Sequence, residues 1–265
     1  MYRPTAKHKR NQNQAERVAL ITGAASGIGQ ACAEALHQGG IRVAIADIKA
    51  KEGQEVAARL HGLYLDADLR SRAGCFQAVA ATVERFGRLD ILVNNAGFQQ
   101  IAPLPDFPED TWDEMIALML SAPFLLIKYA WHYLIKSGHG RIVNIGSAHS
   151  LTASPFKAGY VTAKHGLLGL TRAVALEGGP HGLTCNIVCP AYVRTALVTD
   201  QIADQARTRG ILPAEVEQQV LLENLAIKKL LEPEDVAAYV AFLCSKGAWG
   251  ITGSAQLIDL GWTAR

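Results

Sequence analysis

The residues with the clearest chemical potential in this chain of 265 residues are Ser147, Tyr160 and Lys164. Lys164 follows Tyr160 by one turn of a helix, so the two side chains share a face. A free phenol has a pKa of about 10 and is a poor base at neutral pH, but a neighbouring positive charge favours the phenolate. Tyr160 can then take the proton of an alcohol as hydride leaves for a cofactor, and return it in the reverse direction. The pattern predicts an oxidoreductase.

A glycine-rich turn near the start of the chain predicts the cofactor. Residues 22–29 read TGAASGIG, and they follow an apolar strand and open a helix. Glycines permit a tight turn and a close backbone approach, and the N–H groups at the helix start can bind a pyrophosphate. In this position the turn indicates a dinucleotide site. Its members are Gly23, Ser26, Gly27, Ile28 and Gly29.

Asp47 selects between the two nicotinamide dinucleotides. It ends the second predicted strand, where a carboxylate accepts hydrogen bonds from the adenosine ribose and repels a 2′-phosphate. Arg42 lies at the other end of that strand, too far away to hold a phosphate, whereas Lys49 and Lys51 lie near Asp47 and argue for one. We expect NAD rather than NADP.

The elements that must position these residues alternate along the chain. Strands are predicted over 18–22, 42–48, 63–69, 90–94, 141–145, 184–189 and 256–259. Helices are predicted from the glycine turn to about Gln38 and over 50–60, 71–86, 110–136 and 156–178. Continuous apolar strands that alternate with helices predict a Rossmann-type α/β fold, a doubly wound parallel seven-stranded sheet with helices on both faces.

No linker divides the alternating pattern, so we expect one catalytic domain over 15–265, preceded by a flexible basic tail over 1–14. Residues 195–231 contain no predicted strand and follow the sixth strand. Ligands of open parallel sheets lie beyond the carboxyl ends of the strands, so this segment is expected to form a small helical lid.

Composition excludes several classes of partner. The net charge is only +2 with basic residues scattered, which gives no footprint for nucleic acid. No run reaches the roughly 18 apolar residues of a membrane span. The five cysteines contain no CxxC pair, and we expect reduced thiols, a cytoplasmic protein and no metal site.

Together these motifs resemble the short-chain dehydrogenase/reductase family. The resemblance rests on the glycine turn, Asn94-Asn95-Ala96-Gly97, Ser147 and Tyr160-xxx-Lys164, and runs from about Arg17 to the C-terminus. It implies that Ser147 hydrogen-bonds the reacting oxygen and that Lys164 also holds the nicotinamide ribose. It further implies a homotetramer built on the helices over 110–136 and 156–178. The other cofactor contacts that it implies are Asp68, Leu69, Asn95, Ala96, Gly97, Pro190 and Val193.

Within that family the chain is most similar to 3-hydroxybutyrate dehydrogenases, through segments 94–103, 147–164 and 185–201 and the closing Gly261-Trp262. This resemblance implies interconversion of (R)-3-hydroxybutyrate and acetoacetate. The residues that it implies around the substrate, beside Ser147 and Tyr160, are Gln99, His149, Lys157, Tyr192, Gln201 and Trp262. From the residues alone, His149 could instead be a loop residue bonded to backbone, Lys157 a solvated lysine and Gln201 a surface side chain.

Three positions depart from the family pattern. Met119 stands where an Asn usually supports a water relay to the lysine, and a thioether cannot replace an amide there. Ala191 and Leu260 replace glycines, and either would be strained if its φ were positive. Two alternatives therefore stay open: a dehydrogenase or reductase of another small hydroxy or keto acid, and an NAD-binding protein with weak or no turnover.

Overall fold

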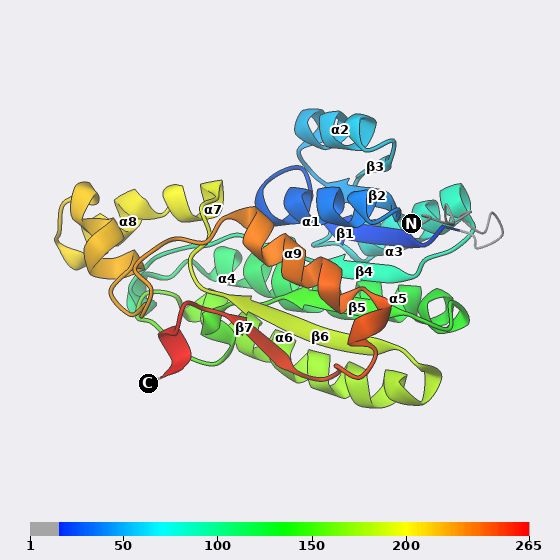
Figure 1. Cartoon of the computed structure of the whole chain (residues 1–265). Coiled ribbons are helices and arrows are strands. Elements are labelled where there is room, and N and C mark those ends of the chain that lie inside the picture. Colours follow the sequence, from blue (N-terminus) through cyan, green and yellow to red (C-terminus); the bar gives the residue numbers. More distant parts are fainter. Residues whose placement is uncertain (1–15, 265) are drawn as a thin grey trace, which may run out of the picture.

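A computed structural model describes residues 16–264 of the chain. Its centre is one seven-stranded parallel sheet with the strand order β3-β2-β1-β4-β5-β6-β7 (Figure 1). The strands are β1 Val18–Thr22, β2 Arg42–Asp47, β3 Leu63–Asp66, β4 Ile91–Asn94, β5 Arg141–Ile145, β6 Thr184–Pro190 and β7 Ala255–Ile258. The Rossmann-type fold is confirmed. The tail expected over 1–14 lies outside the described residues, so the domain boundary drawn there stays a prediction.

Helices cover both faces of the sheet, because alternate residues of each buried strand point to opposite sides. Ile21 and Ile45 pack with α1, α2 and α9, whereas Leu20 and Leu92 pack with α3, α5 and α6. The helices are α1 Gly27–Gln38, α2 Ala50–Arg59, α3 Arg72–Phe86, α4 Glu109–Ile116, α5 Ala122–Lys136, α6 Ala158–Gly178 and α9 Pro233–Leu243. All five cysteines are buried and free.

Three predicted elements differ from the structure. The helix expected over 156–178 begins at Ala158, because Phe156 has a φ of +68° and Lys157 is not helical. The third strand ends at Asp66, before 67–69, because the chain then turns and the carbonyl of Asp68 accepts a hydrogen bond from the amide of Ser71. The long helix expected over 110–136 is interrupted by a π-helical segment, η2 Ala117–Ser121, which contains Met119. Such π-bulges occur often at functional sites.

The run Glu109–Lys136 is long and apolar enough to cross a membrane by length and composition alone, the one such helix among residues 16–264. A core helix passes the same test. Here α5 contributes Leu126, Ala130 and Leu134 to the core beside the sheet. The apolar character of this run therefore matches its packing against the sheet.

The segment 195–231, which is expected to act as a lid, is largely helical and has no strand of the sheet. It contains α7 Ala196–Thr199, α8 Ile202–Arg209, η5 Pro213–Glu215 and η6 Glu217–Leu221. Figure 1 shows α7 and α8 extending beyond the sheet. A β-bridge between Val193 and Leu231 closes the segment at its base, and Val198, Val216 and Leu225 join its helices to the core. The lid therefore stands over the carboxyl ends of the strands.

The glycine turn is held from the neighbouring strand end. The side-chain amide of Asn95 donates to the carbonyls of Thr22 and Gly23 at 2.9 and 3.0 Å, and the hydroxyl of Thr22 accepts from the amide of Asn95 at 2.9 Å. A Cβ on Gly23 would lie 2.8 Å from the Cα of Ala96, and one on Gly29 would meet the carbonyl of Gly23. Glycine is required at Gly23 because the two loops touch there through their backbones, and at Gly29 because the helix start packs on the backbone of the turn and on the side chain of Asn95.

We predict that Gly29→Ala lowers the free energy of unfolding by about 1–3 kcal/mol and weakens dinucleotide binding, because the new methyl group would push the turn at Gly23 and the side chain of Asn95 away from the helix start. Thermal unfolding and NADH fluorescence titration measure the two effects. Gly179→Ala is the matched control, since Gly179 has a helical φ of −52° and open space around its Cα. Equal behaviour of the two variants would contradict the role given to this contact.

Candidate active site

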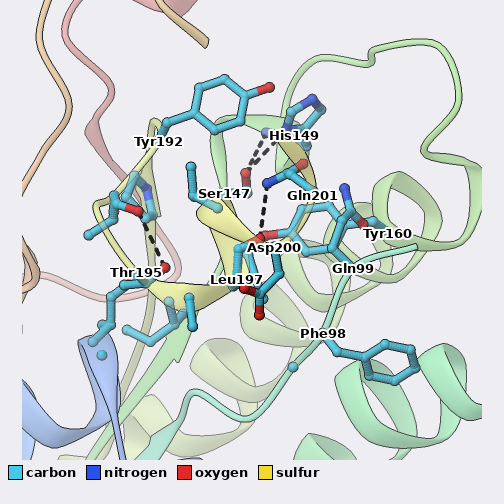
Figure 2. Close-up of a pocket in the computed structure, with 18 of the residues that line it drawn as sticks. Phe98, Gln99, Ser147, His149, Tyr160, Tyr192, Thr195, Leu197, Asp200 and Gln201 are labelled. Atoms are coloured by element: carbon cyan, nitrogen blue, oxygen red, sulfur yellow. Dashed lines mark hydrogen bonds between the residues drawn. The ribbon is translucent and has the colours of Figure 1, made fainter. Parts of the chain in front are cut away.

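Most of the predicted site residues line one cavity of about 580 Å³ at the carboxyl ends of the strands, below the lid (Figure 2). Those that line it are Ser26, Gly27, Ile28, Asn95, Gly97, Gln99, Ser147, His149, Lys157, Tyr160, Lys164, Pro190, Tyr192, Val193, Gln201 and Trp262. A second cavity, of about 320 Å³, shares Gly97 and Phe98 with the first and is lined by Gly23, Asp47, Asp68, Leu69 and Ala96. Only Gly29 of the predicted residues lines neither; it lies buried under the turn.

Ser147, Tyr160 and Lys164 come from two adjacent elements. Ser147 caps η3 Ala148–Ser150 just after β5, and its hydroxyl is hydrogen-bonded to that of Tyr160. Tyr160 and Lys164 lie in the first turns of α6, with the Lys164 Nζ 5.4 Å from the centroid of the Tyr160 ring. Lys164 Nζ also donates to the carbonyl of Ile145 at 2.7 Å, which fixes the ammonium between strand and helix.

Burial governs the ionisation of this group. It raises the pKa of Tyr160 to about 12, and the hydrogen bond from Ser147 acts in the opposite direction. Burial also lowers the pKa of Lys164 to about 8. Both shifts favour neutral forms when the cavity holds no charged partner, so the phenolate needs additional positive charge near it.

The residues around the two cavities fit a nicotinamide dinucleotide. The glycine turn lines the larger cavity through Ser26, Gly27 and Ile28, and it opens α1, whose first amides can bind an anion. Asp47 is held at the smaller cavity because its carboxylate accepts from the amides of Ala25 and Lys49 at 2.9 and 3.0 Å. When bound, such a dinucleotide supplies the acceptor or donor of hydride.

Asp68 also lines the smaller cavity, but its carboxylate already has a partner. Arg70 donates to both of its oxygens, at 3.0 and 2.9 Å, and also to Glu114 at 2.9 Å. The hydrogen bonds from Arg70 lower the pKa of Asp68. The predicted adenine contact therefore has to use an oxygen that Arg70 shares.

The opposite end of the larger cavity contains a buried lysine. Lys157 is 2% exposed, and its Nζ donates to the hydroxyl of Tyr192 at 3.1 Å. No carboxylate among residues 16–264 forms an ion pair with it. Burial, and then the charge of Arg209, lower the pKa of Lys157 to about 7. The alternative of a solvated lysine is wrong.

His149 is likewise part of the cavity wall. Its two ring nitrogens lie 3.3 Å from the hydroxyl of Ser147 and 2.9 Å from that of Ser154, so the alternative of a ring bonded to backbone is wrong. Burial lowers its pKa to about 3, which keeps the imidazole neutral. The ring stands edge-on to Tyr160 and Trp262, and Trp262 stacks on Tyr192 at 5.3 Å.

Two glutamines complete this end. Gln201 reaches in from the lid, is only 5% exposed, and donates from Nε2 to the carbonyl of Leu197 at 3.1 Å, so the surface alternative is wrong (Figure 2). The Oε1 of Gln99 is buried without a hydrogen-bond partner. This end of the cavity therefore contains a buried lysine, neutral hydrogen-bond donors and the Gln99 amide, whose oxygen has no partner.

Several residues that contribute here were not identified from the sequence. Thr195 lines the cavity and its methyl group would touch a Cβ on Gly27 at 3.1 Å; its place close after Pro190 and Val193 was the available signal. Phe156 has a φ of +68°, which turns the chain just before Lys157. Nothing in the local sequence marks that turn, since left-handed conformations favour Gly, Asn and Asp.

The three departures from the family pattern have different consequences. Met119 is buried in an apolar cluster with Met115 and Ala163, against Tyr160, so no side-chain amide reaches Lys164 from this position. The φ of Ala191 is not positive, so the strain expected there is absent. Leu260 does have a positive φ, +55°, and its carbonyl accepts from the amides of Ala226 and Ile227. That turn presents Trp262 to the cavity.

Comparison with known proteins assigns the family. The profile of a family described as Enoyl-(Acyl carrier protein) reductase matches residues 23–263. The chain belongs to the short-chain dehydrogenase/reductase family. Its members use NAD or NADP. It is therefore an oxidoreductase of the dehydrogenase/reductase type.

Individual relatives cover nearly the whole chain. The chain is 44% identical to the D-beta-hydroxybutyrate dehydrogenase of Rhizobium meliloti (strain 1021) over 256 residues, 94% of this chain and 99% of the relative. It is 35% identical to a protein of the same name from Cupriavidus necator over 259 residues, 94% and 98% of the two chains. It is also 40% identical over 255 residues, 94% and 99%, to an uncharacterized oxidoreductase, YxjF, of Bacillus subtilis (strain 168).

No group of three or more His, Cys, Asp or Glu side chains that could hold a metal ion occurs within residues 16–264.

We predict opposite pH dependence for the two directions of the reaction. Oxidation of an alcohol needs the Tyr160 phenolate, so its kcat/KM rises with pH, whereas reduction needs the phenol, so its kcat/KM falls. Profiles between about pH 6 and 10 in both directions measure this. Tyr160→Phe should lower both rates by about 10²–10⁴-fold, and Tyr129→Phe, which alters a ring packed on Phe76, should not. Unchanged profiles in Tyr160→Phe would reject the assignment.

Proposed function

We propose that this protein is an NAD-dependent dehydrogenase that interconverts (R)-3-hydroxybutyrate and acetoacetate. The observation that carries the proposal is the buried Lys157, which lines the same cavity as Tyr160 and has no acidic partner among the described residues. A buried cation costs free energy unless an opposite charge compensates it. The carboxylate of a small hydroxy acid supplies that charge.

The geometry supports one orientation of the substrate. Its hydroxyl lies at Tyr160 and Ser147, where Tyr160 removes the proton and Ser147 donates to the reacting oxygen. Its carboxylate lies at Lys157, where the second N–H of the Gln201 amide can donate to it and Gln99 lines the same end of the cavity. Neutral His149 bonds Ser147 and so steadies the hydroxyl that holds the substrate oxygen. Lys157 immediately precedes α6 and Tyr160 lies in its first turn, so one short segment of chain carries both ends of the site.

The size of this end supports a short substrate. Lys157, Tyr192, His149 and Trp262 close it with bulky side chains, three of them aromatic rings in mutual contact. Two relatives named D-beta-hydroxybutyrate dehydrogenase support the same substrate and enantiomer. A dehydrogenase or reductase of another small hydroxy acid is the second candidate, since the YxjF relative bears no substrate name.

Asp47 supports NAD over NADP. Its carboxylate is held by two backbone amides at the edge of the smaller cavity, and a 2′-phosphate there would meet this negative charge. The homotetramer and the cytoplasmic location stay predictions. Exposed Phe124 on α5 and Leu176 on α6 give the expected helical interface apolar contacts. The mass in solution by light scattering decides the assembly.

The test is NADH formation from NAD with (R)-3-hydroxybutyrate, compared with the S enantiomer and with NADP. We expect turnover with the R form and NAD. Lys157→Met should raise the KM for the acid by about 10–100-fold and leave the KM for NAD unchanged, because it removes a charged hydrogen bond to the carboxylate.

Lys246→Met, which removes an exposed lysine remote from the cavity, is the control and should change neither KM. Turnover of a different hydroxy acid at a far higher kcat/KM would replace the substrate assignment. Binding of NAD without turnover of any hydroxy acid would favour the alternative of an NAD-binding protein with weak or no turnover.

A further inference from the structure

Behind the carboxylate end of the cavity, three polar side chains form a hydrogen-bonded row along the lid. Gln201, Gln205 and Arg209 are spaced by four residues, so they share one face of α8. Arg209 Nε donates to Gln205 Oε1 at 3.1 Å, and Gln205 Nε2 donates to Gln201 Oε1 at 3.3 Å. Gln205 is fully buried, although it does not line the cavity.

The donors and acceptors of the three side chains fix the direction of the hydrogen bonds in this row. A guanidinium has donors and no acceptor, so the Gln205 atom that faces Arg209 must be its oxygen. The amide nitrogen of Gln205 then points to Gln201 and requires the Gln201 oxygen. Gln201 has one amide hydrogen bonded to the carbonyl of Leu197 and a second one left over. The row therefore removes the acceptor of Gln201 from the cavity and leaves a donor.

We propose that Gln205 and Arg209 are positioning residues that hold the Gln201 amide with its N–H toward the substrate carboxylate, and so select acids over uncharged alcohols. This inference rests on the proposed function. A carboxylate accepts hydrogen bonds only, and an amide turned by 180° would present its oxygen and repel it. The carbonyl of Leu197 favours this orientation by accepting from the Gln201 nitrogen, and Gln205 fixes it further by donating to the Gln201 oxygen.

Arg209, the first donor of the row, is held by packing against Phe156. Its guanidinium lies 5.6 Å from the ring centroid of Phe156, the residue with positive φ before Lys157. Arg209 therefore connects the lid to the segment that positions the buried lysine. Burial and then the charge of Arg209 lower the pKa of Lys157, whereas at Tyr192 burial raises the pKa and the charge of Arg209 opposes that rise. Substituting Arg209 thus changes two things, and Gln205 is the cleaner position to test.

The test compares (R)-3-hydroxybutyrate with its uncharged methyl ester in Gln205→Glu, Gln205→Met and the unsubstituted chain. A carboxylate at 205 accepts from Arg209 and from the Gln201 amide, and so turns Gln201 to present its oxygen. We expect the KM for the acid to rise by about tenfold or more in Gln205→Glu and by less in Gln205→Met, with the KM for the ester and for NAD unchanged.

A double-mutant cycle separates orientation from added charge. In a Gln201→Leu background, Gln205→Glu should have no further effect on the KM for the acid. Gln218→Glu, which adds the same charge to an exposed part of the lid, is the control and should leave both KM values unchanged. A loss that persists without Gln201, or that affects the ester equally, would overturn the proposal.

Different measurements decide the proposed function and the proposed role of the row. Turnover of the unsubstituted chain with hydroxy acids decides the proposed function, and the acid-to-ester ratio of the variants decides the row. If Gln205→Glu does not fold, as judged by thermal unfolding, Arg209→Met replaces it; this half-buried position at the helix end should keep the fold and lower the acid-to-ester ratio, with partial rescue in Arg209→Lys. An unchanged ratio in Arg209→Met would also overturn the proposal.

Discussion

The buried ammonium of Lys157 is the constraint on which the substrate end of this structure depends. Its position is set by two backbone features: the left-handed Phe156, which turns the chain inward, and the start of α6 immediately afterwards. The charge is surrounded by the Tyr192 hydroxyl and aromatic rings, without an acid among the described residues. Such a site is stable only because the lysine can lose its proton or gain an anion.

One short stretch of chain carries the groups at both ends of the substrate. Tyr160 and Lys164 lie one turn apart in α6, and Lys157 is the residue just before the helix, with a non-helical φ of −126°. Lys157, Tyr160 and Lys164 all line the same cavity. The remaining elements place the cofactor loops and the lid around this segment.

Much of this arrangement followed from the sequence because it depends on local periodicity. The strands, the glycine turn and the pair Tyr160 and Lys164 are set by apolar runs and helical spacing, and the structure has them at the predicted positions. Boundaries failed where tertiary contacts decide. The chain leaves β3 at Asp66 to form a turn around Asp68, and the helix around Met119 widens into a π-helical segment beside α6.

The residues that position the substrate end of the site could not be predicted from the sequence, because they too depend on tertiary contacts. The positive φ of Phe156 has no marker in the residue type, and the contact of Arg209 with its ring joins segments distant in the sequence. The burial of Gln201 and Gln205 depends on how the lid closes onto the strand ends, which polar residue types do not predict. Leu260, by contrast, stood out as a departure, and the structure does give it the strained conformation.

The most direct test of the account is a crystal structure of the chain with NAD and acetoacetate, a pair of oxidised ligands that cannot react. The account predicts the carboxylate of acetoacetate within about 3 Å of the Lys157 Nζ, with its keto oxygen on the hydroxyls of Tyr160 and Ser147. A carboxylate bound elsewhere, at the exposed rim near Asp200 or turned toward the cofactor, would contradict it, because Lys157 would then remain a buried cation without a function.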